Sequence, residues 1–149
     1  MNSRNILTIS AIALLGLALV PSSTLAQQQQ TLRQQLVGTW EVVSVETGNK
    51  QFVGTNPKGY FGFGGSGKYI FMWKKADRPK DAGRADGVVA GYGSWSVDET
   101  NKTVTLHTEG SMNPNTEGTD GKFTISINGD ELRATSAQNS TNVFRRVRQ

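Results

Sequence analysis

The residues best spaced for chemistry are the single histidine and a glutamate two positions after it. The segment "TVTLHTEGS" (103–111) is typical of a β-strand, in which successive side chains point to opposite faces. This period places His107 and Glu109 on one face and Val104, Leu106 and Thr108 on the other. An imidazole and a carboxylate on one face can share a hydrogen bond and transfer protons. Two interpretations stay open: a tentative catalytic acid–base pair of an isomerase, cyclase or hydratase, or two polar residues on the solvated face of a strand.

Aromatic residues are numerous, and several share one face of a predicted strand. Tyr69, Phe71 and Trp73 alternate with other residues in "KYIFMWK", and Tyr92 adds a further ring with a polar tip. Apolar walls with a few polar tips suit a small apolar or partly oxygenated ligand. The turn "SMNPNTEGT" (111–119) would lie at the mouth of such a site. The predicted ligand-binding residues are Tyr69, Phe71, Trp73, Tyr92, His107, Glu109 and Asn113.

A glycine-rich stretch offers a nucleotide-binding interpretation, which the residues around it exclude. "GFGGSGK" (62–68) matches part of a phosphate-binding loop, but Tyr69 stands where Ser or Thr must hold magnesium. The following "KYIFMW" is a strand pattern, whereas a phosphate loop needs a helix N-terminus. The glycines are therefore predicted to form a turn. With no cysteine and one histidine, disulfides, thiolate sites and multi-histidine metal sites are excluded, so we expect no metal and no cofactor.

The elements that must position these residues are almost all strands. Thr31 to Leu36 could form one helical turn with Thr31 as its N-cap. Alternating apolar residues between turn signals predict strands at about 38–46, 58–63, 67–73, 89–97, 102–109, 121–127, 130–136 and 141–148, and the short 51–54 run is either strand or loop. Such a hairpin succession favours a single antiparallel eight-stranded up-and-down barrel. The long charged loop 74–88 is expected to break this meander, and it gives a third functional alternative, an interaction or stress protein that uses this loop.

A series of segments then resembles one known family. In order they are Gly38-Thr39-Trp40, "NPKGYFGF" (56–63), "GKYIF" (67–71), "ADRP" (76–79), "AGYGSWSVD" (90–98), "KTVTLHTEGSMNPNTEGT" (102–119), "GDELRATS" (129–136) and "NVFRRV" (142–147). The chain is similar to the bacterial lipocalin-like domain family from about residue 36 to residue 147. The resemblance implies a small exported barrel.

The resemblance also implies roles for single residues. In the family, the Trp of a G-x-W motif plugs the closed end of the barrel, and Gly38 and Trp40 match this motif. An Arg near the end of the family's last strand packs over the indole of that Trp. Arg145 or Arg146 matches this role, and we expect Arg145. The family carries a His and a Glu in the stretch that holds His107 and Glu109. An aromatic commonly stands where this chain has Thr116, which implies a wider or more polar site here.

The N-terminal segment has the pattern of an export signal. A basic start at Arg4, an apolar run over 6–20 and the small residues Thr24 and Ala26 predict a secretory signal peptide over 1–26. A flexible polar leader (27–35) and one domain (36–149) follow. The apolar run is short for a membrane span, so we expect no stable membrane insertion and a periplasmic or secreted monomer. The net charge of +4 is scattered, which argues against nucleic-acid binding. The leading hypothesis is exported, non-covalent binding of a small molecule inside the barrel.

Overall fold

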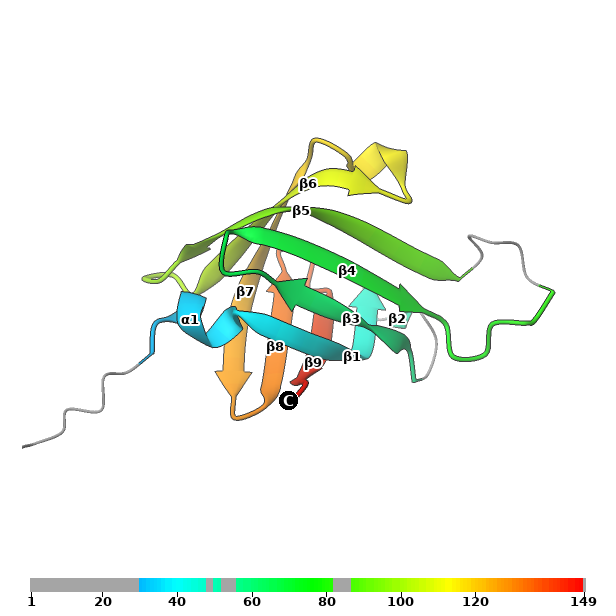
Figure 1. Ribbon diagram of the computed structural model, residues 1–149, viewed down its shortest axis with the longest axis horizontal. Coiled ribbons are helices and arrows are strands. Elements are labelled where there is room, and N and C mark those ends of the chain that lie inside the picture. Colours follow the sequence, from blue (N-terminus) through cyan, green and yellow to red (C-terminus); the bar gives the residue numbers. More distant parts are fainter. Residues whose placement is uncertain (1–29, 48–49, 52–55, 82–86, 149) are drawn as a thin grey trace, which may run out of the picture.

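The strands close into one antiparallel barrel (Figure 1). The computed structural model describes residues 30–47, 50–51, 56–81 and 87–148. The predicted signal peptide and residues 27–29 of the leader therefore lie outside the described residues. The elements are α1 (Leu32–Leu36), β1 (Gly38–Thr47), β2 (Lys50–Gln51), β3 (Lys58–Phe63), β4 (Lys68–Lys74), β5 (Val88–Asp98), β6 (Thr103–Ser111), the 3₁₀ turn η1 (Pro114–Thr116), β7 (Asp120–Asn128), β8 (Glu131–Ser136) and β9 (Thr141–Arg146).

Closure comes from the pairing of the first and last long strands. The sheet order runs from β1 through β3 to β9, and β9 pairs back with β1 from Trp40↔Arg146 to Val45↔Asn142. The two-residue β2 pairs only with the end of β1, so eight strands form the barrel, and residues 52–54 of the predicted short run lie outside the described residues. Closure leaves these strands no unpaired edge. The predicted fold class is confirmed.

The loop after β4 does not break the meander as the sequence suggested. Lys74 at the end of β4 pairs with Val88 at the start of β5, and the Lys75 amide donates to the Gly87 carbonyl at 2.7 Å. The pairing of β4 with β5 continues up to both ends of the loop, so the loop does not interrupt the sheet. The glycines of 62–68 form a turn as predicted, with the Gly64 amide donating to the Lys68 carbonyl at 2.8 Å.

Alternation along the strands creates a buried inner face and an exposed outer face. In β4, Tyr69 and Trp73 are buried, whereas Ile70 and Met72 between them are exposed. The same alternation in the other strands fills one continuous core, whose buried members are Leu32, Leu36, Trp40, Val42, Val45, Phe61, Phe63, Tyr69, Trp73, Trp95, Val104, Ile125, Leu132, Ala134 and Phe144.

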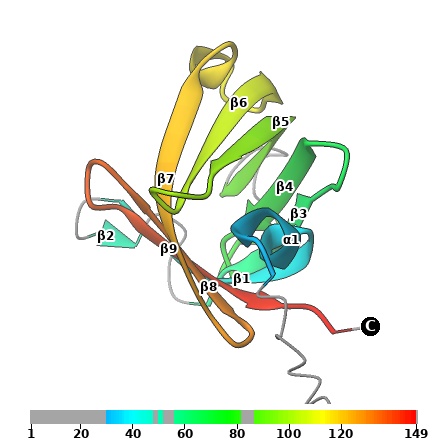
Figure 2. The same ribbon diagram turned by 90° about the vertical axis from the view of Figure 1, so that its left-hand side faces the viewer.

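The helix α1 lies across one end of the barrel (Figure 2), and Trp40 is buried in the core together with the helix residues. Thr31 caps α1 through a reciprocal capping box, and the helix buries Leu32 and Leu36. The Trp40 indole is fully buried and donates from Nε1 to the Leu36 carbonyl at 2.8 Å. The helix is also held to the β5–β6 turn, because the Leu32 and Arg33 amides donate to the Glu99 carboxylate. Trp40 of the predicted Gly38–Trp40 motif therefore packs at the end of the barrel that α1 covers.

The arginine over the indole is Arg146, not Arg145 as expected. The Arg146 guanidinium lies 4.1 Å from the centre of the Trp40 ring and donates to the Gln35 and Val37 carbonyls. The register explains the correction, because Arg146 is opposite Trp40 while Arg145 is opposite Glu41 and points outward. Neighbouring residues of a strand face opposite sides, so only one of the two arginines can cover the plug.

This geometry predicts that the two neighbouring arginines differ in their effect on stability. Arg146→Ala removes a cation–π contact and two charged hydrogen bonds, and we expect the unfolding free energy to fall by about 2 kcal/mol. Arg145→Ala is the matched control and should change it by less than about 0.5 kcal/mol. Urea unfolding followed by circular dichroism measures both values. Equal losses for the two variants would show that the Arg146–Trp40 contact does not stabilise the closed end.

Candidate functional site

The barrel interior holds a cavity of about 340 Å³ that extends to the end opposite α1. Strand direction fixes this position, because the ends of β4, β6 and β8 and the starts of β5, β7 and β9 all lie away from α1. Exposed residues of the β6–β7 connection form part of its wall, so the cavity reaches the surface there. The lining residues are Phe61, Phe63, Tyr69, Phe71, Trp73, Val89, Val104, Leu106, Thr108, Ser111, Asn113, Thr116, Thr119, Asp120, Gly121, Phe123, Ile125, Leu132, Ala134, Asn142 and Phe144.

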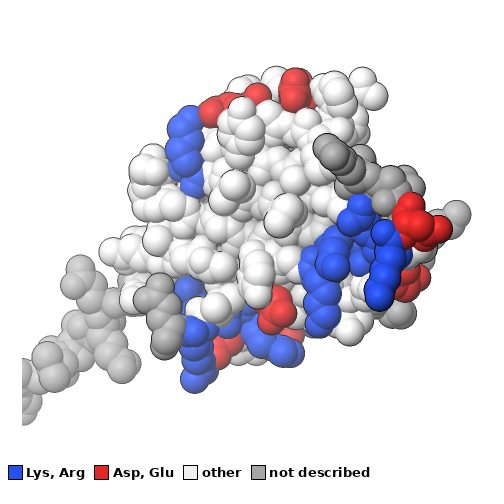
Figure 3. Space-filling model, turned by 45° about the vertical axis from the view of Figure 1, so that its right-hand side comes forward, with Lys and Arg blue, Asp and Glu red and all other residues white. Residues whose placement is uncertain are grey.

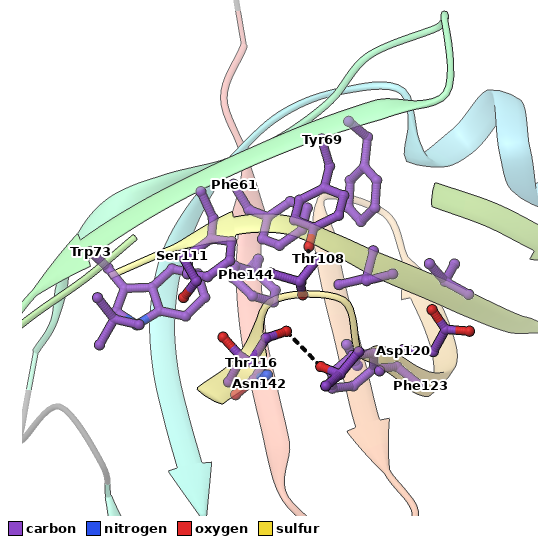
Figure 4. A pocket seen from close by; sticks show the side chains of 18 of the residues that line it. Phe61, Tyr69, Trp73, Thr108, Ser111, Thr116, Asp120, Phe123, Asn142 and Phe144 are labelled. Carbon is purple, nitrogen blue, oxygen red and sulfur yellow. Dashed lines mark hydrogen bonds between the residues drawn. The ribbon is translucent and has the colours of Figure 1, made fainter. Parts of the chain in front are cut away.

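One wall of the cavity is a row of nearly parallel aromatic rings from β3 and β4 (Figure 4). Phe61 and Phe71 lie at 7° to one another and Tyr69 and Phe71 at 8°, while the Phe71 and Trp73 ring centres are 4.5 Å apart. Phe144 from β9 meets Phe61 edge-on at 67°, and its ring centre lies 6.1 Å from that of Trp73. The predicted shared face of Tyr69, Phe71 and Trp73 is thus present. Parallel rings present a flat apolar surface against which another flat molecule can lie.

Three polar groups interrupt the apolar wall. The Tyr69 hydroxyl lies 3.2 Å from Thr108 Oγ1, and burial raises the pKa of this phenol above its usual value of 10.0. Two further atoms, Trp73 Nε1 and Asn142 Oδ1, are buried and have no hydrogen-bond partner among the described residues. A buried polar atom without a partner costs about 1–3 kcal/mol, so these two atoms are the unusual feature of the wall.

Asn142 was missed by the sequence analysis, although a signal for it exists. It precedes the buried Phe144 by two residues on β9, and this spacing places both side chains on the inner face. A polar residue at an inward position of a strand is the pattern that could have revealed it.

The proposed pair of His107 and Glu109 is not formed, which corrects the acid–base hypothesis. His107 Nδ1 lies 2.7 Å from Asp120 Oδ1 and Glu109 Oε1 lies 2.6 Å from Lys68 Nζ. The Lys68 hydrogen bond holds the pKa of the Glu109 carboxyl below its usual value. Both side chains point outward because Val104, Leu106 and Thr108 of the same strand face the cavity. The physical reason is that residues two apart on a strand are farther from each other than from directly paired residues, so His107 meets Asp120 on the adjacent β7. The long Lys68 side chain reaches Glu109 from β4, across β5.

Tyr92 is also placed outside the cavity, whereas Asn113 lies at its mouth. Tyr92 pairs with Ile70 on the outer face, is 54% exposed, and packs so closely over Gly110 that a Cβ there would lie 2.4 Å from the ring. Its expected role in the cavity is therefore corrected. Asn113 lines the rim and accepts from the Asn115 amide at 3.2 Å, which caps η1 and shapes the entrance. Thr116 also lines the cavity there.

Neither a metal centre nor a membrane span is found in the part of the chain that the structure describes. Within those ranges, no three His, Cys, Asp or Glu side chains are placed to hold a metal ion. Among the same residues, the helices are all too short or too polar to cross a membrane.

The architecture matches a crystal structure of a lipocalin-like protein from Bacteroides uniformis ATCC 8492. The two superpose with a TM-score of 0.52 at 16% sequence identity, over 75% of this chain and 98% of that one. No family model and no curated protein matches the sequence. The chain therefore has a lipocalin-like fold, an eight-stranded closed antiparallel barrel with a short helix.

The buried phenol predicts a loss of stability at high pH. Because burial raises the pKa of Tyr69, the folded state keeps its proton where the unfolded chain has lost it. The contribution of the neutral phenol to the unfolding free energy is fully present below the pKa of 10.0 that Tyr69 has in the unfolded chain. It is lost as the pH rises through the higher pKa of the folded state. We expect the unfolding free energy to decrease above pH 10, and Tyr69→Phe to remove this part of the decrease. The same pH profile in both proteins would contradict the burial of this hydroxyl.

Proposed function

We propose that the protein is an exported binding protein that holds a small, mainly apolar molecule in its barrel. The observation that carries this proposal is the cavity of about 340 Å³ lined by aromatic rings. A barrel of eight strands can instead be filled by its own side chains, and such a barrel would have no room for a ligand. This volume is at the lower end of the range for small-molecule pockets, so the ligand should be about the size of one or two fused rings.

The wall also favours a flat ligand that carries a polar group. The near-parallel rings of Phe61, Tyr69 and Phe71 offer a stacking surface for a planar molecule. The unpaired Trp73 N–H can donate to a ligand oxygen, and the unpaired Asn142 carbonyl can accept from a ligand hydroxyl. Neighbouring side chains cover both atoms, so a ligand would reach them after a small side-chain rotation. Such hydrogen bonds would offset the free-energy cost of burying these two polar atoms without a partner.

Export is proposed from the N-terminal pattern alone. The short basic start, the apolar run and the small residues before Gln27 have the order of a cleaved secretory signal. The enzyme hypothesis has no support from the geometry, because the side chains of His107 and Glu109 pair separately with Asp120 and Lys68 and do not line the cavity.

Filling the cavity should abolish binding. Ala134 lines the cavity on β8, and Ala134→Phe places a ring inside it. We expect binding of naphthalene, measured by quenching of tryptophan fluorescence, to weaken at least tenfold. Ser126→Phe adds the same ring to the outer face of the neighbouring strand and should bind as the unaltered protein does. If both variants bind equally well, or if the unaltered protein shows no saturable binding, the interior is not the binding site.

Replacing Asn142 should separate stability from ligand preference. Leu has nearly the shape of Asn but no unpaired oxygen, so Asn142→Leu should raise the unfolding free energy by about 1 kcal/mol. It should also weaken 2-naphthol about two- to tenfold and leave naphthalene unchanged, because only the naphthol hydroxyl can pair with the amide. Calorimetric titration with both compounds measures the difference. An equal change for the two compounds would show that Asn142 does not recognise a polar group.

A further inference from the structure

The outer face of β3, β4 and β5 carries large apolar side chains in contact with solvent. The exposed fractions are 66% for Ile70, 61% for Met72, and 54% each for Tyr60 and Tyr92. Strand register makes them neighbours, because Tyr60 is opposite Met72 and Ile70 is opposite Tyr92. We call these four residues the apolar face. None of them lines the cavity, so the proposed ligand site does not account for them.

A row of lysines borders the apolar face at the open end of the barrel. Lys58 and Lys74 are directly opposite each other in the β3–β4 ladder, and Lys75 follows. Like charges at opposed positions destabilise a sheet. The side-chain ion pairs of the described residues are Lys68–Glu109, His107–Asp120, Arg133–Glu131 and Arg148–Asp130, and they leave these three lysines without an acidic partner. The arrangement is therefore a cost to folding that no contact within the described residues offsets.

The charge of the whole border is positive. Residues 74–81 and Lys58 together hold five basic side chains, with Asp77 and Asp81 as the acidic ones. Figure 3 shows this gathering of lysine and arginine beside a broad area without charge. An apolar surface with a basic border matches an anionic bilayer, in which phosphate groups meet the lysines and the acyl boundary accepts the apolar side chains. Two tyrosines suit this position, because their rings are apolar and their hydroxyls stay among the headgroups.

We propose that the apolar face and its lysine border dock the protein on the surface of an anionic lipid bilayer. Lys58, Lys74 and Lys75 contact the headgroups, and Ile70 and Met72 enter the boundary with the acyl chains. Because the lysines lie at the open end of the barrel, docking brings the mouth of the cavity close to the bilayer. The barrel remains folded and lies on the surface. This surface is independent of the proposed ligand site, since no residue is common to both.

Sedimentation with lipid vesicles tests the proposal. The full chain, expressed in a host that processes export signals, is mixed with vesicles of phosphatidylcholine alone or with an equal part of phosphatidylglycerol. We expect binding to the anionic vesicles at least tenfold stronger than to the neutral ones, and weaker binding as salt is added. Binding that is equal on both vesicles would overturn the proposal.

Matched variants identify the surface. Lys74→Gln and Lys75→Gln should each reduce the partition onto anionic vesicles about fivefold. The double variant Ile70→Ser, Met72→Ser should abolish it. Lys122→Gln, an exposed lysine on β7, should bind as the unaltered protein does. All variants share one N-terminal segment, so any contribution of that segment cancels, and unchanged thermal melts verify their folding.

Two other outcomes would also overturn the proposal. If the serine variant binds vesicles like the unaltered protein, the apolar face is not the docking surface. If the unaltered chain is a dimer in solution, becomes a monomer in the serine variant and binds no vesicles, then the occupant of this face is a second copy of the chain.

Discussion

The pairing of β1 with β9 is the constraint on which the rest of the structure depends. It turns a meander into a closed barrel, and its register places Arg146 across from Trp40 and Phe144 across from Val42. The first of these pairs seals the end beneath α1, and the second brings an inward ring to the aromatic wall. With one end sealed, any molecule that enters the interior must pass the other end. The position of the cavity mouth is therefore a consequence of how the chain closes.

The strand β4 carries large apolar side chains on both the inner and the outer face of the barrel. Its inner residues Tyr69, Phe71 and Trp73 build the aromatic wall, while Ile70 and Met72 stand exposed on the outside. A strand that packs on one side only normally alternates apolar with polar residues. The uninterrupted run "YIFMW" departs from this rule, and burial inside the barrel explains only half of it. The proposed bilayer contact explains the other half.

Much of the fold could be predicted from the sequence, because alternation and turn residues act locally. The two-residue period of a strand placed Tyr69, Phe71 and Trp73 on one face of their strand. It also placed His107 and Leu106 on different faces of theirs. What failed depended on the register between paired strands: Arg146 rather than Arg145 reaches Trp40, and Asp120 rather than Glu109 reaches His107. The free volume of the cavity was beyond prediction, since it depends on how all inner side chains pack together.

The central claim is that a flat apolar molecule lies inside the barrel, and nuclear Overhauser contacts from a bound probe test it most directly. With naphthalene as the probe, the account predicts contacts to inward side chains of the cavity wall such as Val89, Leu106 and Ile125. Outward side chains such as Val43 and Ile70 should show none. Contacts confined to those outward residues, or no contacts at saturating probe, would contradict the account.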